Sequence, residues 1–140
     1  MAGAIQLEVA TPERLLLREQ VSEVSLPGAR GQLGILPQHA PLLTELGPGE
    51  LSYVPEGGQR KFIAVRGGWA EVLPDHVRVL ATGAEFADEI DVKRAEEALK
   101  RAEANLTSAK QELDTAKAYN KMLRAQARLE AARHGGHARR

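Results

Sequence analysis

The sequence contains no cysteine among its 140 residues. This absence excludes disulfides, thiolate metal sites and cysteine nucleophiles. Aromatic residues are scarce, at 4%, so we expect a core of Leu, Val, Ile and Ala. No apolar run approaches the roughly 20 residues of a membrane-spanning helix, and residues 1–6 lack the basic and apolar stretches of a secretory signal. The composition predicts a folded, soluble protein of one domain, or of one small domain plus an appendage.

Glycine and proline are both absent from residues 84–134. All seven prolines lie at or before Pro74, and eleven of the thirteen glycines lie at or before Gly83. Residues 1–90 carry 7 basic against 12 acidic side chains, whereas residues 91–140 carry 12 basic against 7 acidic. We therefore predict two units, 1–87 and 88–140, and we expect the basic second unit to meet a partner with an acidic surface.

Short strands with frequent turns dominate the first unit. Apolar and polar residues alternate in residues 5–9 and 76–80, which is the pattern of a strand with one buried face. Pro-Gly, Gly-Gly and Pro-Asp pairs at 27–28, 67–68 and 74–75 mark turns between such runs. No helical pattern separates the runs, so a β-sandwich or barrel is favoured over a parallel sheet.

Two helices are predicted in the second unit. Apolar residues recur at alternating spacings of three and four in residues 92–106 and again in residues 113–127, as in helices that pair through one seam. We expect Asp88 to cap the first helix, and a capping box of Ser108 and Gln111 to start the second after a turn near residues 105–108. The end of the chain, with His134 and His137, is expected to be frayed, with metal ligation by these histidines as the alternative. The predicted fold class is α+β, an N-terminal antiparallel β-sandwich followed by a C-terminal antiparallel two-helix hairpin.

The second predicted helix has two apolar faces. Leu123 and Ala127 fall on one side at about 100° per residue, and Ala125 and Leu129 fall nearly opposite. The second face either packs on the strand unit or gives the helix an alternative docking site. Alanine buries little area, so such a seam is weak, as a switch requires. Between the two faces runs a basic stripe formed by Lys117, Lys121, Arg124 and Arg128.

Three motifs resemble those of one protein family. Residues 31–42 read GQLGILPQHAPL and resemble the G-x-x-G-I-L-P-x-H-x-P-L signature of the epsilon subunit of F-type ATP synthases. Residues 67–72 (GGWAEV) and 90–95 (IDVKRA) are similar to that family's G-G-aromatic-x-E-V and I-D-x-x-R-A motifs, in the expected order and spacing. The resemblance covers the chain from about residue 5 to residue 132. The sandwich-plus-hairpin architecture is already predicted from the residues, and the resemblance adds the family.

This resemblance implies a non-catalytic rotor subunit of the central stalk, whose partners are the gamma subunit, the c-ring and the alpha/beta catalytic head. Such a subunit helps couple proton transport to ATP synthesis at the cytoplasmic face of the bacterial cell membrane, which it meets only through the complex. Its extended arm restrains ATP hydrolysis by meeting an acidic segment of the beta subunits, a contact expected at Lys117, Lys121, Arg124 and Arg128. The residues expected at the gamma and c-ring interface are Gly31, Gly34, Ile35, Leu36, Pro37, His39 and Pro41. The alternative for the histidine is a local hydrogen bond within the loop.

Some members of this family bind ATP as a regulator that is not hydrolysed, and the resemblance implies such a site here. Asp91 and the backbone near Ile90 are expected to accept from the adenine amino group, and arginines are expected to bind phosphate oxygens. ATP would then bridge the two helices and favour the closed arm. The alternative is an Asp91–Arg94 helix pair beside a solvated basic face. The predicted ATP-binding residues are Glu85, Ile90, Asp91, Arg94, Ala95, Arg124 and Arg128.

Other function classes are weighed against this one. The sequence has no Walker-type G-x-x-x-x-G-K-[ST] motif and no triad, zinc or carboxylate-dyad spacing, so we expect no hydrolysis and no metal. A coiled-coil adaptor would have a fixed partner and no response to ATP. A nucleic-acid-binding module would place the basic stripe on phosphates, but no aromatic platform accompanies the stripe, so we expect no nucleic-acid partner.

Overall fold

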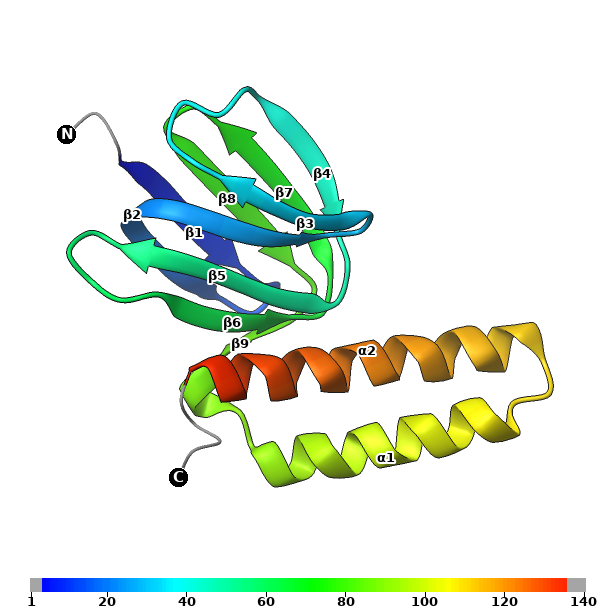
Figure 1. Ribbon diagram of the computed structural model, residues 1–140. Helices are drawn as coiled ribbons and strands as arrows, with labels where there is room; N and C mark the ends of the chain where they lie inside the picture. The colour runs from blue at the N-terminus through cyan, green and yellow to red at the C-terminus, as the bar shows by residue number, and fades with distance from the viewer. Residues whose placement is uncertain (1–3, 136–140) are drawn as a thin grey trace.

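The computed structural model describes residues 4–135, which form a β-sandwich followed by a pair of helices (Figure 1). The predicted α+β fold class is confirmed. A short 3-10 turn, η1 (Ala87–Glu89), leads from the strands to α1 (Val92–Ser108) and α2 (Glu112–His134). The strands are β1 (Ile5–Ala10), β2 (Leu15–Gly28), β3 (Gly31–Ile35), β4 (Leu42–Leu46), β5 (Gly49–Pro55), β6 (Lys61–Val65), β7 (Gly68–Leu73), β8 (His76–Ala81) and β9 (Ala84–Phe86).

The strands hydrogen-bond in the order β1-β8-β7-β4-β2-β5-β6-β9, with β3 alongside β2. The long strand β2 pairs with β1, β3 and β5, and its register with β5 shifts between Val21 and Glu23. Residues of β2 before this irregularity pair with β1 and residues after it pair with β3, so one strand serves both layers of the sandwich. The first strand, β1, runs parallel to β8, while the other pairings within residues 4–135 are antiparallel.

Alternating side chains fill the core between the layers. Strand β1 buries Ile5, Leu7 and Val9, and the neighbouring strand β8 buries Val77 and Val79. Each fully buried side chain of this size contributes roughly 1.5–3 kcal/mol, and a one-residue slip would turn all of them outward. The hydrophobic pattern therefore fixes the register of the sandwich.

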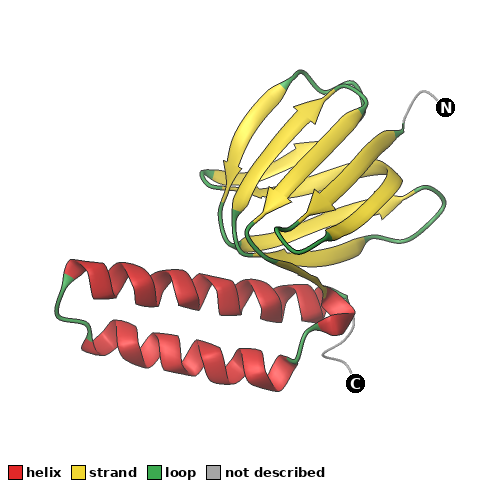
Figure 2. Cartoon of the chain, turned by 180° about the vertical axis from the view of Figure 1, so that it is seen from behind, coloured by secondary structure: helices red, strands yellow, loops and turns green. Residues whose placement is uncertain are grey.

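Helix α2 lies between α1 and the sandwich (Figures 1 and 2). It contacts β5, β6 and η1 as well as α1. Near its C-terminal end, Ala131 and Ala132 are fully buried in a cluster with Ala64, Ala87 and Ile90, which we call the docking seam.

Arg128 and His134 reach Glu85 and Glu50 of the sandwich from the side of α2 that carries Ala127 and Ala131. Ala118 on the opposite side is buried beside the end of α1. The face predicted to pair with the first helix therefore packs on the strand unit, and the second apolar face packs on α1.

The predicted cap of the first helix is wrong. Asp88 lies within η1, and the cap of α1 is Asp91, whose Oδ1 accepts from the backbone N–H of Arg94 at 3.0 Å. Ile90 is buried in the docking seam with an extended backbone. Because Ile90 is buried with an extended backbone, it cannot lie within a helix. The cap of α1 is therefore Asp91, three residues after the predicted cap at Asp88.

The predicted capping box between the helices does not form. Ser108 is the last residue of α1, and its hydroxyl donates to the carbonyl of Ala104 at 3.1 Å. This bond to the preceding turn competes with capping of the next helix. Gln111 stands at the N-cap of α2 without a side-chain capping bond, and Leu113, predicted in the seam between the helices, is 63% exposed.

The end of α2 is ordered further than predicted. His134 is its last residue, so the fraying expected from this position is wrong. Its Nδ1 lies 2.6 Å from Oε2 of Glu50, and its ring stacks at a tilt against Phe62 with centroids 5.2 Å apart. These contacts hold the helix end against β5 and β6. The second histidine of the predicted tail, His137, lies outside the described residues.

Candidate functional site

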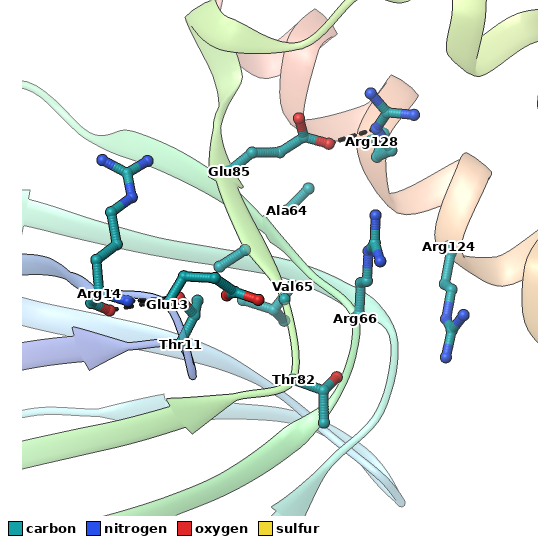
Figure 3. A pocket seen from close by; sticks show the side chains of 12 residues that line it. Thr11, Glu13, Arg14, Ala64, Val65, Arg66, Thr82, Glu85, Arg124 and Arg128 are labelled. Atoms are coloured by element: carbon teal, nitrogen blue, oxygen red, sulfur yellow. Dashed lines mark hydrogen bonds and ion pairs between the residues drawn. The ribbon is translucent and has the colours of Figure 1, made fainter.

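A cleft of about 310 Å³ lies between the edge of the sandwich and α2 (Figure 3). The sandwich contributes the connection between β1 and β2, the end of β6, and the segment from β8 to β9, while α2 contributes two arginines. Arginines outnumber acidic residues in the lining, so the cleft favours an anion. Its charged lining residues are Glu13, Arg14, Arg66, Glu85, Arg124 and Arg128.

An ion pair joins the two walls of this cleft. The Nε of Arg128 on α2 donates to Oε1 of Glu85 on β9. Glu85 pairs with Ala64 in the β6–β9 ladder, which fixes the position of its carboxylate at the sheet edge beside the helix. Both side chains are partly buried, so this pair is less screened than a surface ion pair, which contributes about 0–1 kcal/mol.

Two further arginines bring positive charge to the cleft without a counterion. Neither Arg66 nor Arg124 has a carboxylate oxygen within 4.0 Å among residues 4–135. The Nε of Arg124 is also buried and has no hydrogen-bond partner in the described chain. A buried donor without a partner costs about 1–3 kcal/mol, so an anion that accepts from Arg124 would recover this free energy.

Three of the seven predicted ATP-binding residues meet in this cleft: Glu85, Arg124 and Arg128. Glu85 and Arg128 are 43 positions apart in the sequence, and only the docking of α2 on the sandwich brings them together. The remaining four lie at the start of α1 and do not line the cleft. These are Ile90, Asp91, Arg94 and Ala95.

The residues at the start of α1 have structural roles in this conformation. Ile90 and Ala95 are buried, and Arg94 is exposed. Asp91 is exposed and uses Oδ1 to cap the helix, which leaves its second oxygen without a hydrogen bond to the described chain. The predicted Asp91–Arg94 side-chain ion pair is absent from the described residues, because the contact between them is the backbone cap.

Sequence reasoning missed Arg14 and Arg66 as lining residues. Both lie in the strand unit, next to turns. The hydrophobic periodicity of a strand does not predict which of its end residues a distant helix will approach. One feature of the sequence could have indicated the position of Arg66. This arginine directly precedes the GGWAEV motif, whose glycines end the preceding strand.

The basic stripe of α2 is divided when the helix is docked. Lys117 and Lys121 are exposed, whereas Arg124 and Arg128 are partly buried at the cleft. The stripe is therefore not one continuous exposed surface, which weighs against the nucleic-acid alternative.

The predicted gamma and c-ring residues lie in β3 and in the loop that follows it. Ile35 is buried in the sandwich core, so its side chain is not presented to a partner in this conformation. His39 donates from Nδ1 to the carbonyl of Ala40 at 2.6 Å, which is the local bond named as its alternative role. Pro37 is partly buried. The exposed members of the set are Gly31, Gly34, Leu36 and Pro41.

An apolar face on the outside of β4, β7 and β8 was not predicted. Leu43, Trp69 and Leu80 are 70%, 51% and 58% exposed, and Leu73 is also exposed. Trp69 pairs with Leu80 across β7 and β8, so their side chains share one face of the sheet. We call these four residues the outer apolar face. Large exposed apolar side chains gathered on one sheet face are typical of a protein-binding surface.

Within residues 4–135, no group of three or more His, Asp or Glu side chains is arranged to hold a metal ion. In the same part of the chain, neither α1 nor α2 combines the length and apolar character that crossing a membrane requires.

Two family models match the two parts of the molecule. The beta-sandwich domain of ATP synthase delta/epsilon chains matches residues 4–87, and the long alpha-helix domain of the same chains matches residues 88–133. The chain belongs to the ATP synthase delta/epsilon family. It is 52% identical to the ATP synthase epsilon chain of Solibacter usitatus and 47% identical to that of Syntrophobacter fumaroxidans, in each case over 94% of this chain and 98% of the relative.

Solved structures agree with this membership. A chain in the OSCP/F1/c-ring assembly of Euglena gracilis mitochondrial ATP synthase superimposes with a TM-score of 0.82 at 26% identity, over 94% of this chain and 82% of that one. A chain in the central stalk/c-ring of Tetrahymena thermophila mitochondrial ATP synthase shares the fold, with a TM-score of 0.63 at 13% identity over 91% and 96% of the two chains. This delta/epsilon family member is a non-catalytic, central-stalk epsilon subunit of F-type ATP synthase, as the sequence motifs predicted.

Proposed function

We propose that this epsilon-type chain is a regulatory rotor subunit whose helical arm restrains ATP hydrolysis when it leaves the sandwich. The sandwich docks on the gamma subunit and the c-ring, at the cytoplasmic face of the bacterial cell membrane, and takes part in coupling proton transport to ATP synthesis. The observation that carries the regulatory part is the small docking seam between α2 and the sandwich.

The docking seam is built mainly from alanine. Four of its five buried residues are alanines, Ile90 is the one large side chain among them, and the partly buried Phe62 and Val92 pack against the cluster. A buried methylene contributes about 0.8 kcal/mol, whereas a buried Leu or Ile contributes roughly 1.5–3 kcal/mol. The arm is therefore held far less firmly than the strands of the core. A difference of a few kcal/mol between docked and extended arms is within the range that one ligand or partner can reverse.

Release of the arm would also expose charge suited to the catalytic head. In the docked arm, Arg124 and Arg128 line the cleft beside the sandwich, and Lys117 and Lys121 are the exposed members of the stripe. Extension frees all four for an acidic segment of the beta subunits. Arginine forms bidentate pairs with carboxylates, so Arg124 and Arg128 would carry more of this contact than the lysines.

ATP is the proposed ligand that opposes extension. Its phosphates would occupy the cleft, where Arg124 has an unpartnered Nε and Arg128 lies against Glu85. Ile90, Asp91 and Ala95 remain the proposed adenine side of the site, with the second carboxylate oxygen of Asp91 accepting from the amino group. Arg94, predicted at the phosphates, does not line the cleft. ATP would bind only the docked arm and would stabilise that state without being hydrolysed.

Titration of ATP into the full-length chain tests this ligand. At 100 times its dissociation constant, ATP is expected to add about 2.7 kcal/mol to the stability of the docked state, because it binds that state alone. The thermal midpoint, read by calorimetry without divalent metal, should rise accordingly. The Arg124→Ala variant should lose most of the rise, and Lys117→Ala, an exposed member of the same stripe, should keep it. No rise in the unmodified chain at millimolar ATP contradicts nucleotide binding and leaves the rotor assignment standing.

The outer apolar face is the surface proposed to dock on gamma. We expect Trp69→Ala to weaken binding to a catalytic head that lacks this chain by about 30-fold, since a central aromatic anchor contributes about 2 kcal/mol or more. Tyr119→Ala is the matched control, because Tyr119 is an aromatic residue on α2 with the same 51% exposure as Trp69. Equal affinities for the two variants would show that gamma binds elsewhere on the sandwich.

A further inference from the structure

We infer that Arg66, contributed by the β-sandwich, is a third phosphate-binding arginine of the cleft, so that a bound nucleoside triphosphate joins the sandwich directly to α2. This inference rests on the proposed ATP site and names the residue through which that site senses docking. The sequence suggested a different bridge, in which ATP spans the two helices from Arg94 to Arg124 and Arg128. Arg94 does not line the cleft, whereas Arg66 does.

The backbone around Arg66 holds its side chain at the cleft. Its N–H donates to the carbonyl of Gly83 at 2.9 Å, at the point where the chain leaves β6 and approaches β9. The side chain then passes over Gly83. A Cβ added there would lie 2.8 Å from Cδ and 3.1 Å from Nε of Arg66. The absence of a side chain at position 83 therefore leaves the path that Arg66 occupies.

The charges of the cleft are unbalanced at one end. Glu85 is already paired with Arg128, and Arg66 and Arg124 have no counterion in the described chain. Figure 3 shows the Arg66 side chain extending from the sandwich toward α2, among Glu85, Arg124 and Arg128. Two guanidinium groups facing one cleft repel each other, and an anion between them removes this repulsion while accepting hydrogen bonds from both.

The ligand chemistry that fits is a chain of phosphates. Each guanidinium offers a planar set of donors that matches two oxygens of a phosphate, and arginines on two walls require oxygens on both sides of the ligand. A triphosphate supplies these oxygens and enough negative charge for both arginines, whereas a single phosphate supplies less of each. Because Arg66 belongs to the sandwich and Arg124 to the arm, the two can hold one ligand only when the arm is docked.

The test is binding of ATP and of tripolyphosphate to the full-length chain without divalent metal, measured by isothermal titration. We expect Arg66→Ser to lower the affinity for both ligands by about 10- to 100-fold, the range for a lost charge-assisted contact. Arg30→Ser is the matched control, because Arg30 is an exposed arginine of the sandwich outside the cleft. A second variant, Gly83→Ala, keeps Arg66 but displaces its side chain, and it should weaken binding in the same direction.

The outcomes separate this inference from the proposed function. ATP binding by the unmodified chain with unchanged affinity in Arg66→Ser overturns the role of Arg66 and leaves the ATP site standing. Loss of affinity for ATP but not for tripolyphosphate also overturns it, since the contact would then not be to phosphates. No binding of ATP by the unmodified chain overturns both. A parallel loss for both ligands, with the unliganded thermal midpoint unchanged, supports the assignment.

Discussion

Replacing Ala131 by leucine is expected to release α2 from the sandwich while both units stay folded. Ala131 is fully buried in the docking seam with Ala64, Ala87 and Ile90, so we expect a leucine side chain there to displace its neighbours. Overpacking of such a site costs about 1–3 kcal/mol. The seam is thin, so the strain is relieved by undocking and not by unfolding of the core, and the extended arm becomes roughly 5- to 150-fold more populated.

Two measurements check this release. The chain has no cysteine, so a pair introduced at exposed Glu56 and Lys117 can carry a donor and an acceptor dye. Energy transfer between them should fall in Ala131→Leu. In a catalytic head reconstituted with the variant, ATP hydrolysis should be inhibited more strongly than with the unmodified chain. Ala116→Leu makes the same change at an exposed position of α2 and should alter neither reading. If Ala131→Leu matches Ala116→Leu in both, the arm is not held by this seam.

Replacing Gly68 by alanine is expected to unfold the sandwich. Gly68 opens β7 with a φ of +140°, a conformation that side-chain-bearing residues rarely adopt. An added Cβ would lie 2.1 Å from the carbonyl oxygen of Leu80 and 2.9 Å from Cα of Ala81, both on the paired strand β8. Backbone cannot yield as a side-chain tip can, so we expect a loss of about 3 kcal/mol or more. The thermal midpoint should fall by about 10 °C or more.

The control for this prediction is alanine at another strand glycine. Gly34 in β3 has no positive φ, and an added Cβ would meet no heavy atom within 4 Å. Gly34→Ala should therefore change the unfolding free energy by less than about 0.5 kcal/mol. Similar midpoints for the two variants would mean that β7 and β8 can separate at this edge at little cost, contrary to the packing described here.

The docking seam and the cleft lie at the same boundary between sandwich and arm. The docking seam contributes a weak hydrophobic contact made largely by alanine. The cleft contributes arginine side chains from both of its walls, which can form directional hydrogen bonds to one ligand. We expect the docked and extended arms to differ little in free energy, so a ligand that binds in the cleft can decide which of them predominates. This arrangement allows a ligand of ordinary affinity to control the position of the arm.

Local patterns predicted what depends on local forces. The alternation in β1 and β8, the turn at Pro74-Asp75 and the three-four spacing of α1 appear where the sequence placed them, whereas Pro27-Gly28, predicted as a turn, forms the end of β2. The helix boundaries were less predictable. Asp88 has the chemistry of a cap, but the burial of Ile90 moved the start of α1 to Asp91, since burying an isoleucine outweighs the choice between two capping aspartates.

The sequence by itself determined the sandwich, the two helices, the family and the unusual second apolar face of α2. Only the tertiary structure decided which apolar face of α2 packs on β5 and β6, that Ile35 lies inside the core, and that Arg66 joins Glu85, Arg124 and Arg128 around one cleft. The physical reason is the range of the interactions. Propensity and periodicity act between residues a few positions apart, whereas the cleft joins Arg66 to Arg124 and Glu85 to Arg128, roughly 40 to 60 positions apart, whose proximity exists only once the arm has docked.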